Sequence, residues 1–215
     1  MLEFISSSSQ RLVSASTFAP TSSTGSVTFW VKPLVSLSGV KVIMQSATSY
    51  TIFTNGGVLS CGLWRASGKR ETGSTLSVGT RYFLAFTYYP GSKQVNNIYI
   101  NGALDATGDN NSSTPGTLSL YIADNGVGAY ADVEIEDFRI YNGRALSLAE
   151  IQTIYGCNGH DGIVDGLTHR WRMNESSGIA SGAGSVKDDV GSINMTPSGS
   201  PVYKGSELTF LRRLP

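Results

Sequence analysis

The sequence predicts an all-β protein, an antiparallel sandwich of two sheets with one short α-helix. Most segments alternate apolar and polar residues with the period of two that half-buried strands require. Glycine, serine and asparagine separate these segments at the spacing of short turns. Only one segment has the period and the capping residues of a helix, which argues against a parallel sheet built from strand-helix-strand units.

The expected strands follow one another from the first residues to position 141. The clearest hairpin turns at Asn55-Gly56, because these two residue types readily adopt the backbone angles of a tight turn. In chain order the strands are expected at 26–31, 40–45, 50–54, 57–64, 81–88, 97–101, 117–123 and 131–141. The side chains expected in the core include Trp30, Phe83, Ala85, Phe138 and Ile140.

The single helix is expected to begin after Ser147 and to end at Gly156. The Ser147 hydroxyl can accept the amide of Glu150, and the Glu150 carboxylate can accept the amide of Ser147, which together form a capping box. The side chains on its apolar face are Leu148, Ile151, Ile154 and Tyr155. Beyond the helix, short strands are expected at 167–173, 193–203 and 208–211, with a loop at 176–184.

The composition excludes several classes of protein. Lys+Arg and Asp+Glu are each 16, and this zero net charge argues against a nucleic-acid partner. No apolar run approaches the ~20 residues of a membrane span, and the first residues do not resemble a secretory signal. We therefore expect neither a nucleic-acid nor a membrane partner. Cys61 and Cys157 are expected as two free thiols rather than one disulfide, and a zinc site is not expected.

Two stretches resemble a known family. Residues 97–104 (NIYINGAL) resemble the strand and turn of laminin-G-like hairpins. Residues 135–151, which include IEDFRIYN and RALS, resemble the closing strand and helix of laminin-G-type (LamG) jelly rolls in the concanavalin A-like lectin/glucanase superfamily. Together with the first strands, the resemblance covers about residues 1–156. It implies a two-sheet antiparallel jelly roll and leaves the ligand open.

The order of the motifs departs from the family pattern. The opening strand of such domains resembles Leu167 to Glu175 here, and the run that follows it in the family resembles residues 205–210. The chain therefore resembles a circularly permuted LamG domain. We expect one domain over 1–215, in which 1–156 form the main body and 164–215 complete the sandwich. These last strands could also pair with a neighbouring copy or form a separate appendage.

Catalysis is not expected. Glycosidases on this fold need two carboxylates that flank the sugar bond. Glu134 and Glu136 share one face of a strand, but Phe138 stands where the third acid of the glucanase pattern would be. Asp137 should point to the other face unless a bulge intervenes. We read Glu134 and Glu136 as two solvated acids on an outer face, and the protein as a non-enzyme.

A weak calcium site is the one cofactor that the resemblance implies. Pentraxin and laminin-G relatives often hold calcium at one rim of the sandwich. The matching positions here are Asp124 and Asn125, after one strand, and Asn55, at the tip of a hairpin. Calcium needs six to eight oxygen ligands, and only Asp124 is a carboxylate among these residues. The site should be weak or empty, with Asp124 mainly forming a turn.

Sugar recognition on such domains commonly uses an exposed aromatic ring surrounded by polar groups. Trp64 is the candidate for stacking, with Arg65 and Tyr130 as companions. The alternative is that Trp64 is a core residue.

The function expected from these observations is that of a non-catalytic structural protein of a virion surface, as a capsid decoration or fibre component, with glycan binding as a further role. The segment from Asp165 to Tyr203 resembles segments of bacteriophage and environmental LamG proteins. Its partners would be other virion proteins, its own copies in a homo-oligomer, and a cell-surface glycan. The alternative is a free-standing or secreted, extracellular lectin module.

Overall fold

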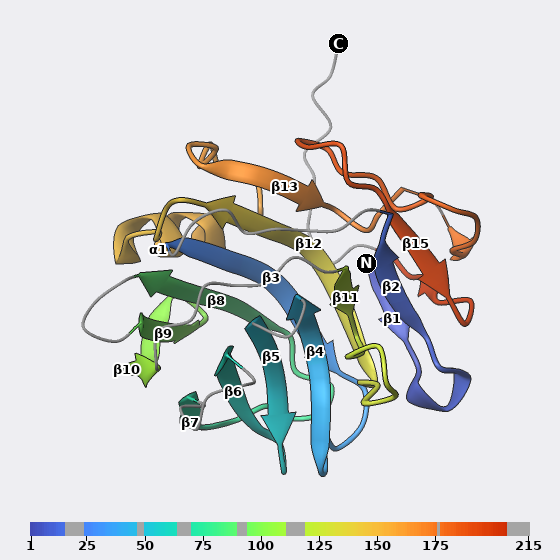
Figure 1. Cartoon of the computed structure of the whole chain (residues 1–215), viewed down its shortest axis with the longest axis horizontal. Helices are drawn as coiled ribbons and strands as arrows, with labels where there is room; N and C mark the ends of the chain where they lie inside the picture. Colours follow the sequence, from blue (N-terminus) through green and yellow to red (C-terminus); the bar gives the residue numbers. More distant parts are fainter. Residues whose placement is uncertain are drawn as a thin grey trace.

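Two antiparallel β-sheets lie face to face and enclose the core (Figure 1). The computed structural model describes residues 1–15, 24–46, 50–63, 70–89, 94–110, 119–175 and 177–205. Within these residues every pairing between named strands is antiparallel. The fold class predicted from the sequence is therefore confirmed.

The larger sheet has nine strands. In sheet order, eight of them are β10 (Ala103–Asn110), β9 (Gln94–Ile100), β8 (Tyr82–Tyr89), β3 (Gly25–Pro33), β12 (Val133–Asn142), β1 (Leu2–Phe4), β16 (Val202–Tyr203) and β14 (Gly178–Ile179). The ninth strand, β13 (Leu167–Trp171), also pairs with β12. One side of β12 pairs with β3, and its other side is shared, because β1 pairs with residues 133–135 and β13 with residues 138–141.

The smaller sheet has seven strands. In sheet order they are β15 (Met195–Ser198), β2 (Arg11–Ser14), β11 (Leu120–Ile122), β4 (Val40–Ser46), β5 (Tyr50–Asn55), β6 (Val58–Leu63) and β7 (Arg70–Thr75). A short 3-10 helix, Ser6–Ser8, joins β1 of one sheet to β2 of the other. The edge strands β7 and β10 come together, and the Ser74 hydroxyl donates a hydrogen bond to Asp105.

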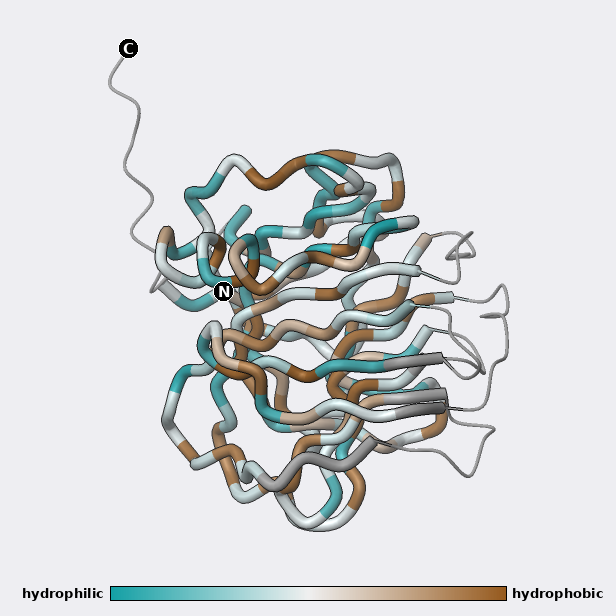
Figure 2. Tube along the Cα trace, turned by 90° about the vertical axis from the view of Figure 1, so that its left-hand side faces the viewer, coloured by the Kyte–Doolittle hydropathy of each residue, from teal (hydrophilic) through white to brown (hydrophobic). Residues whose placement is uncertain are grey.

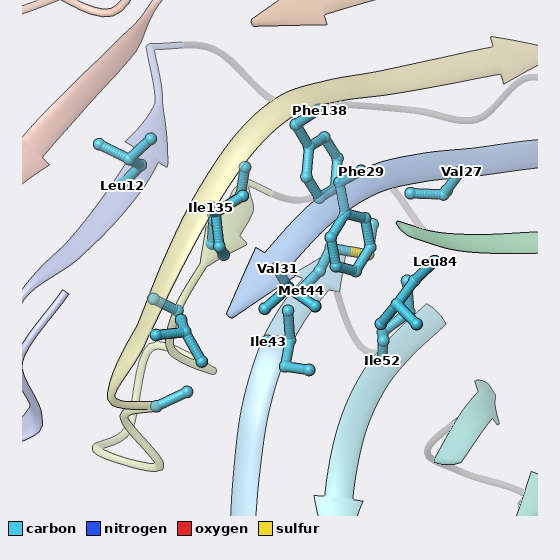
Figure 3. Packing of buried hydrophobic residues seen from close by; sticks show 14 of the residues in the cluster. Leu12, Val27, Phe29, Val31, Ile43, Met44, Ile52, Leu84, Ile135 and Phe138 are labelled. Carbon is cyan, nitrogen blue, oxygen red and sulfur yellow. The ribbon is translucent and has the colours of Figure 1, made fainter. Parts of the chain in front are cut away.

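The core fills the space between the sheets (Figure 3). The rings of Phe29 in β3 and Phe138 in β12 stack with their centroids 5.0 Å apart. Ile43 and Ile52 of the smaller sheet face them and are fully buried. Hydrophobic and hydrophilic positions alternate along the strands (Figure 2), as expected for sheets that bury one face.

A second apolar cluster lies on the outer face of the larger sheet, beneath the helix α1 (Leu148–Gly156). Phe29 points into the main core, so its neighbour Trp30 points to the opposite face. The members of the second cluster are Trp30, Phe83, Ala85, Tyr99, Tyr141, Leu146, Ile151 and Ile154. All five side chains expected in the core are buried, but Trp30, Phe83 and Ala85 belong to this outer cluster.

The helix is built as the sequence predicts. The Glu150 amide donates to Ser147 Oγ at 3.4 Å, and the Ser147 amide donates to Glu150 Oε2 at 2.9 Å. Ile151 and Ile154 are buried, whereas Leu148 is exposed at the start of the helix. Within the described residues, no helix is long and apolar enough to cross a membrane.

The C-terminal residues contribute strands to both sheets within the same chain. Strands β13, β14 and β16 extend the larger sheet, and β15 extends the smaller one. Figure 1 shows β13 beside β12 and β15 beside β2. The Trp171 ring packs 6.1 Å from that of Phe138, and its indole N–H donates to the Ile193 carbonyl at 2.8 Å. Residues 206–215, which include the strand expected at 208–211, lie outside the described residues.

Several strands differ from the sequence expectations. The strand expected at 193–203 is two strands, β15 in the smaller sheet and β16 in the larger one. Strand β14 lies inside the segment expected to be a loop, and β7 and β10 were not expected as strands. Strands β7 and β10 are sheet edges with polar sequences, RETGST and ALDATGDN, so they lack the apolar alternation that marks a half-buried strand. Cys61 is buried and Cys157 is exposed, and no disulfide joins them, as the sequence predicts.

Candidate functional site

The loop that follows β11 is fixed by its own side chains. The Asp124 carboxylate accepts hydrogen bonds from the backbone amides of Gly126 and Gly128, at 2.9 and 3.2 Å. The Asn125 side-chain oxygen accepts two further amides of the loop, at 3.0 and 3.1 Å. Asp124 thus forms the turn that the sequence predicts for it.

The buried Asp124 carboxylate is also neutralised by a cation. Arg11 Nη1 lies 2.9 Å from Asp124 Oδ2 and 3.2 Å from the Tyr130 hydroxyl. Calcium would have to displace Arg11 to bind this carboxylate. Asn55 pairs with Val40 on one side of β4, whereas the loop pairs with β4 on the other side, so β4 lies between Asn55 and Asp124.

The residues expected for calcium are therefore not gathered around one point. Among the described residues, no group of three or more His, Cys, Asp or Glu side chains could hold a metal ion. Trp64 and Arg65 lie outside the described residues. Tyr130 is described, and the Arg11 guanidinium lies 6.0 Å from the centre of its ring.

The outer face of the larger sheet carries the two glutamates of β12. Glu136 is only 2% exposed and Glu134 is also buried, so the expectation of two solvated acids is wrong. The strand register explains this difference, because Glu134 lies opposite Lys32 and Glu136 opposite Trp30 on β3. The neighbouring strand and its side chains cover both carboxylates.

Both glutamates line a small, shallow and open depression. It lies over β3 and β12 at the end near β1, and it is bounded by Met1, Trp30, Val31, Lys32, Arg81, Glu134, Ile135 and Glu136. We call it the outer-face depression. The cations and carboxylates in it are paired: Lys32 Nζ lies 3.1 Å from Glu134 Oε2, and Arg81 Nη2 lies 3.5 Å from Glu136 Oε2.

Two further groups shape the outer-face depression. The Arg81 guanidinium lies 3.9 Å from the centre of the Trp30 ring, close enough for a cation–π contact. The buried indole N–H of Trp30 has no hydrogen-bond acceptor in the described part of the chain. The Met1 amino group lies 3.7 Å from Glu136 Oε1, and its burial lowers its pKa although the Glu136 charge favours the ammonium form.

A bulge in β12 turns the next acid to the same outer face. The register between β12 and β3 shifts between Glu136 and Arg139, and Asp137 has a positive φ of 51°. The Asp137 carboxylate accepts hydrogen bonds from Arg139 Nη2 at 2.7 Å and from Arg170 Nε at 2.6 Å. These contacts engage Asp137 in a buried ion network, and it does not line the outer-face depression.

Sequence reasoning identified the glutamates but missed the residues that complete the depression. Lys32 directly follows the strand expected at 26–31 and Arg81 begins the strand expected at 81–88, and nothing in their local sequence distinguishes them from surface cations. Only the register of β12 against β3 places Lys32 opposite Glu134. Arg11 was likewise missed, because its partner Asp124 is 113 residues away.

Comparisons with known proteins match this architecture. The family model of the concanavalin A-like lectin/glucanases superfamily matches residues 6–152, more than half of the chain. No curated protein matches the chain.

Among solved structures, a candidate carbohydrate-binding protein from Bacteroides ovatus superimposes with a TM-score of 0.66 and 17% identity, over 88% of this chain and 56% of its own. The chain therefore spans little more than half the length of that protein. The heptameric SAP-like pentraxin of Limulus polyphemus gives a TM-score of 0.55 and 16% identity, over 70% and 77% of the two chains.

The receptor binding domain of botulinum neurotoxin type G gives 0.50 and 18% identity, over 62% and 38%. At these identities the three structures show a shared fold. With the family match over residues 6–152, the two-sheet jelly roll identifies the chain as a member of the concanavalin A-like lectin/glucanases superfamily.

Proposed function

We propose that the chain is a non-catalytic, lectin-like module that binds a glycan at the outer-face depression. The observation that carries the proposal is the paired set of cations and carboxylates beside Trp30 in a hollow of the sheet. Ligand sites are concave and combine apolar walls with a few placed polar groups. The outer-face depression is small, but it has the same combination of an apolar wall and a few polar groups.

The ion pairs made by the carboxylates favour binding of a glycan over its hydrolysis. A glycosidase needs one carboxyl group as a general acid and a second one as a nucleophile or base. Glu134 and Glu136 each face a cation, at 3.1 and 3.5 Å, so neither is free for these roles. Asp137 is held by two arginines. The cations of the outer-face depression can donate hydrogen bonds to sugar hydroxyl groups, and its carboxylates can accept hydrogen bonds from them, without catalysing hydrolysis.

The relatives support a glycan as the ligand class. The Bacteroides ovatus protein is a candidate carbohydrate-binding protein, and the cell entry of botulinum neurotoxin type C, whose structure has this fold, depends on interaction with two ganglioside molecules. A glycan array that is run with and without a chelator tests the proposal. We expect binding that survives the chelator, because the outer-face depression needs no metal.

A matched pair of lysine variants locates the binding. Lys32→Gln removes a cation of the outer-face depression, and Lys41→Gln removes a lysine on β4 of the other sheet. We expect Lys32→Gln to weaken array binding and Lys41→Gln to leave it unchanged. Absence of binding by the wild-type protein to any glycan would contradict the proposed function.

We further propose that the module is displayed on a virion surface. A charged content of only 15%, with 25 glycines and many hydroxyl side chains, suits a durable exterior. The resemblance of Asp165 to Tyr203 to phage LamG segments also supports this placement. Mass spectrometry of purified particles tests it: the chain should occur at a fixed copy number. Its recovery only outside particles would favour the alternative, a free-standing or secreted lectin.

A further inference from the structure

Strand β1 fills a defined position in the larger sheet, between β12 and β16. Leu2 pairs with Ile135 of β12 on one side and with Tyr203 of β16 on the other. Leu2 and Phe4 are fully buried in the main core, and Glu3 between them is partly exposed. The position therefore takes two large apolar side chains, separated by one residue that faces outward.

The chain contains a second segment with the same pattern. Residues 2–5 read LEFI and residues 208–211 read LTFL, so both have leucine, a polar residue, phenylalanine and an aliphatic residue in that order. This pattern occurs nowhere else in the sequence. The LTFL segment (208–211) lies outside the described residues, but it follows closely after β16, the strand that pairs with β1. Its place in the chain makes it a candidate for the same position.

The residues between β16 and the LTFL segment have the sequence of a tight turn. In a hairpin with β16, Leu208 would take the place of Leu2. The same register then places Glu207 opposite Lys204 and leaves Gly205-Ser206 as a two-residue loop. Glycine at the first position of such a loop suits a type II′ turn, whose twist matches that of antiparallel strands. Opposite charges across the strands at the loop add to the stability of the hairpin.

The structure holds Lys204 in the pairing that this hairpin needs. The Lys204 amide donates to the Met1 carbonyl at 3.0 Å, and the Met1 amino group donates to the Lys204 carbonyl at 3.4 Å. Two residues that exchange both bonds in this way are a hydrogen-bonded antiparallel pair. Glu207, at the position of Met1, would make the same pair next to the loop.

The charges on the outer face favour β1 as the resident strand. Glu136 is 2% exposed, and its carboxylate lies 3.7 Å from the Met1 amino group. Glu207 at the position of Met1 would bring a second carboxylate opposite Glu136. Like charges directly opposite each other destabilise a sheet. The described structure, with β1 in place, agrees with this preference.

A compensating change occurs at the central residue of the strand. Glu3 lies opposite Glu134, and Lys204 Nζ lies 3.1 Å from the Glu3 carboxylate. Thr209 would remove this pair of like charges, and threonine suits a strand because it is β-branched. The exchange thus replaces one opposition of carboxylates by another and keeps the apolar side chains alike. The two segments are therefore matched closely enough to compete for one position.

From the repeated pattern, the register and the turn sequence, we propose that the LTFL segment is a second occupant of the β1 position. It enters as a hairpin with β16 when β1 leaves. The exchange frees residues 1–5 while leucine and phenylalanine side chains still fill the core. This strand exchange goes beyond glycan binding and does not depend on it.

Variants of the full chain separate the two occupants. The β1 variant, Leu2→Asp/Phe4→Asp, places two charges where β1 enters the core and so excludes β1 from its position. The LTFL variant, Leu208→Asp/Phe210→Asp, makes the matched change in the other segment. The combined variant carries all four substitutions. Each protein is measured by thermal melting and by hydrogen exchange with mass spectrometry of both segments.

We expect the β1 variant to melt cooperatively, with amide protection lost in β1 and gained in the LTFL segment. The LTFL variant should melt like the wild type and keep the protection of β1. The combined variant should lose its cooperative transition, because the core and the edges of β12 and β16 are then uncovered. In the β1 variant, Glu207→Gln should raise the melting temperature, because it removes the carboxylate opposite Glu136.

A β1 variant that loses its cooperative transition, as the combined variant does, would overturn the proposal. So would a folded β1 variant whose LTFL segment exchanges as fast as it does in the LTFL variant. Alanine substitutions give a milder version of the same comparison. Phe4→Ala should lower the melting temperature less than Phe4→Ala/Phe210→Ala does. Equal melting temperatures of these two proteins would also contradict the exchange.

Discussion

The Asp137 carboxylate of the β12 bulge lies 2.6 Å from Arg170 Nε of β13, and its other oxygen lies 2.7 Å from Arg139 Nη2. One side chain thus joins the central strand of the larger sheet to the C-terminal segment. Arg139 Nη1 also donates to Asp161 Oδ1 at 2.9 Å, which fixes the residues that follow α1. The bulge therefore serves as the junction of three segments.

The first prediction concerns this junction. Asp137→Asn removes the charge that two arginines share, and Arg139 is only 1% exposed. Loss of one partner of a buried pair costs about 3–5 kcal/mol. We expect urea denaturation to show a free energy of unfolding lower by about 3 kcal/mol. Asp165→Asn is the control, since Asp165 is 88% exposed, and should change it by less than about 0.5 kcal/mol. Similar values for both variants would contradict the role of the junction.

The second prediction concerns acid stability. Burial alone would raise the pKa of Asp161 and Asp188, but hydrogen bonds from Arg139 to Asp161 and from His169 to Asp188 outweigh it and lower both pKa values. A carboxyl group whose folded pKa is depressed stabilises the fold above its unfolded pKa, near 3.9, and loses this contribution as the pH falls through the folded pKa.

Stability should therefore be nearly constant around pH 6 and fall below about pH 4. The measurement is a series of thermal melts between pH 7 and pH 2. Asp188→Asn should be less stable at neutral pH and show a flatter profile in acid. A profile as steep as that of the wild type would show that Asp188 does not contribute.

The fold was largely predictable from the sequence because its determinants are local. Alternation marks the strands that bury one face, and the residues from Ser147 to Glu150 form the predicted capping box. The edges β7 and β10 were missed because their polar sequences carry no such alternation.

The candidate site was predictable only in part, because it depends on register between distant strands. Glu134 and Glu136 were visible as acids on one face, but their burial follows from pairing with β3, about a hundred residues earlier in the chain. The sequence allowed a bulge near Asp137 but did not show whether one was present; the register of β12 against β3 shows it. The rim residue Asp124 was read correctly as a turn former, and its cation Arg11 was not found.

The third prediction concerns the C-terminal segment, which we propose to be part of one domain with residues 1–156. Deletion of 164–215 removes four strands, β13 to β16, and the buried side chains of Trp171 and Met195. The deletion should leave apolar core and strand edges uncovered, so we expect an insoluble or molten fragment. Circular dichroism and thermal melting provide the measurement. A soluble 1–163 fragment that melts cooperatively near the full-length value would show that the segment is an appendage.

The fourth prediction concerns calcium at the rim, where we propose a weak or empty site. Asp124→Ala leaves Arg11 and two loop amides without their acceptor, so it should lower stability by about 2 kcal/mol. Thermal melts with millimolar calcium and with chelator should coincide for the wild type and for the variant. At a hundredfold excess over its dissociation constant, bound calcium would stabilise by about 2.7 kcal/mol. Such a shift in the wild type that vanishes in Asp124→Ala would contradict the proposal.

The most direct test of glycan binding without catalysis is isothermal titration calorimetry with an oligosaccharide selected on the array. We predict that the wild type gives a saturable heat of binding and that the oligosaccharide recovered from the calorimeter cell is intact. Binding should be at least about tenfold weaker in the double variant Glu134→Gln/Glu136→Gln. Release of new reducing ends would contradict the non-catalytic account. Unchanged affinity in the double variant, with binding lost in Trp64→Ala or Tyr130→Ala, would place the site elsewhere and contradict the assignment to the outer-face depression.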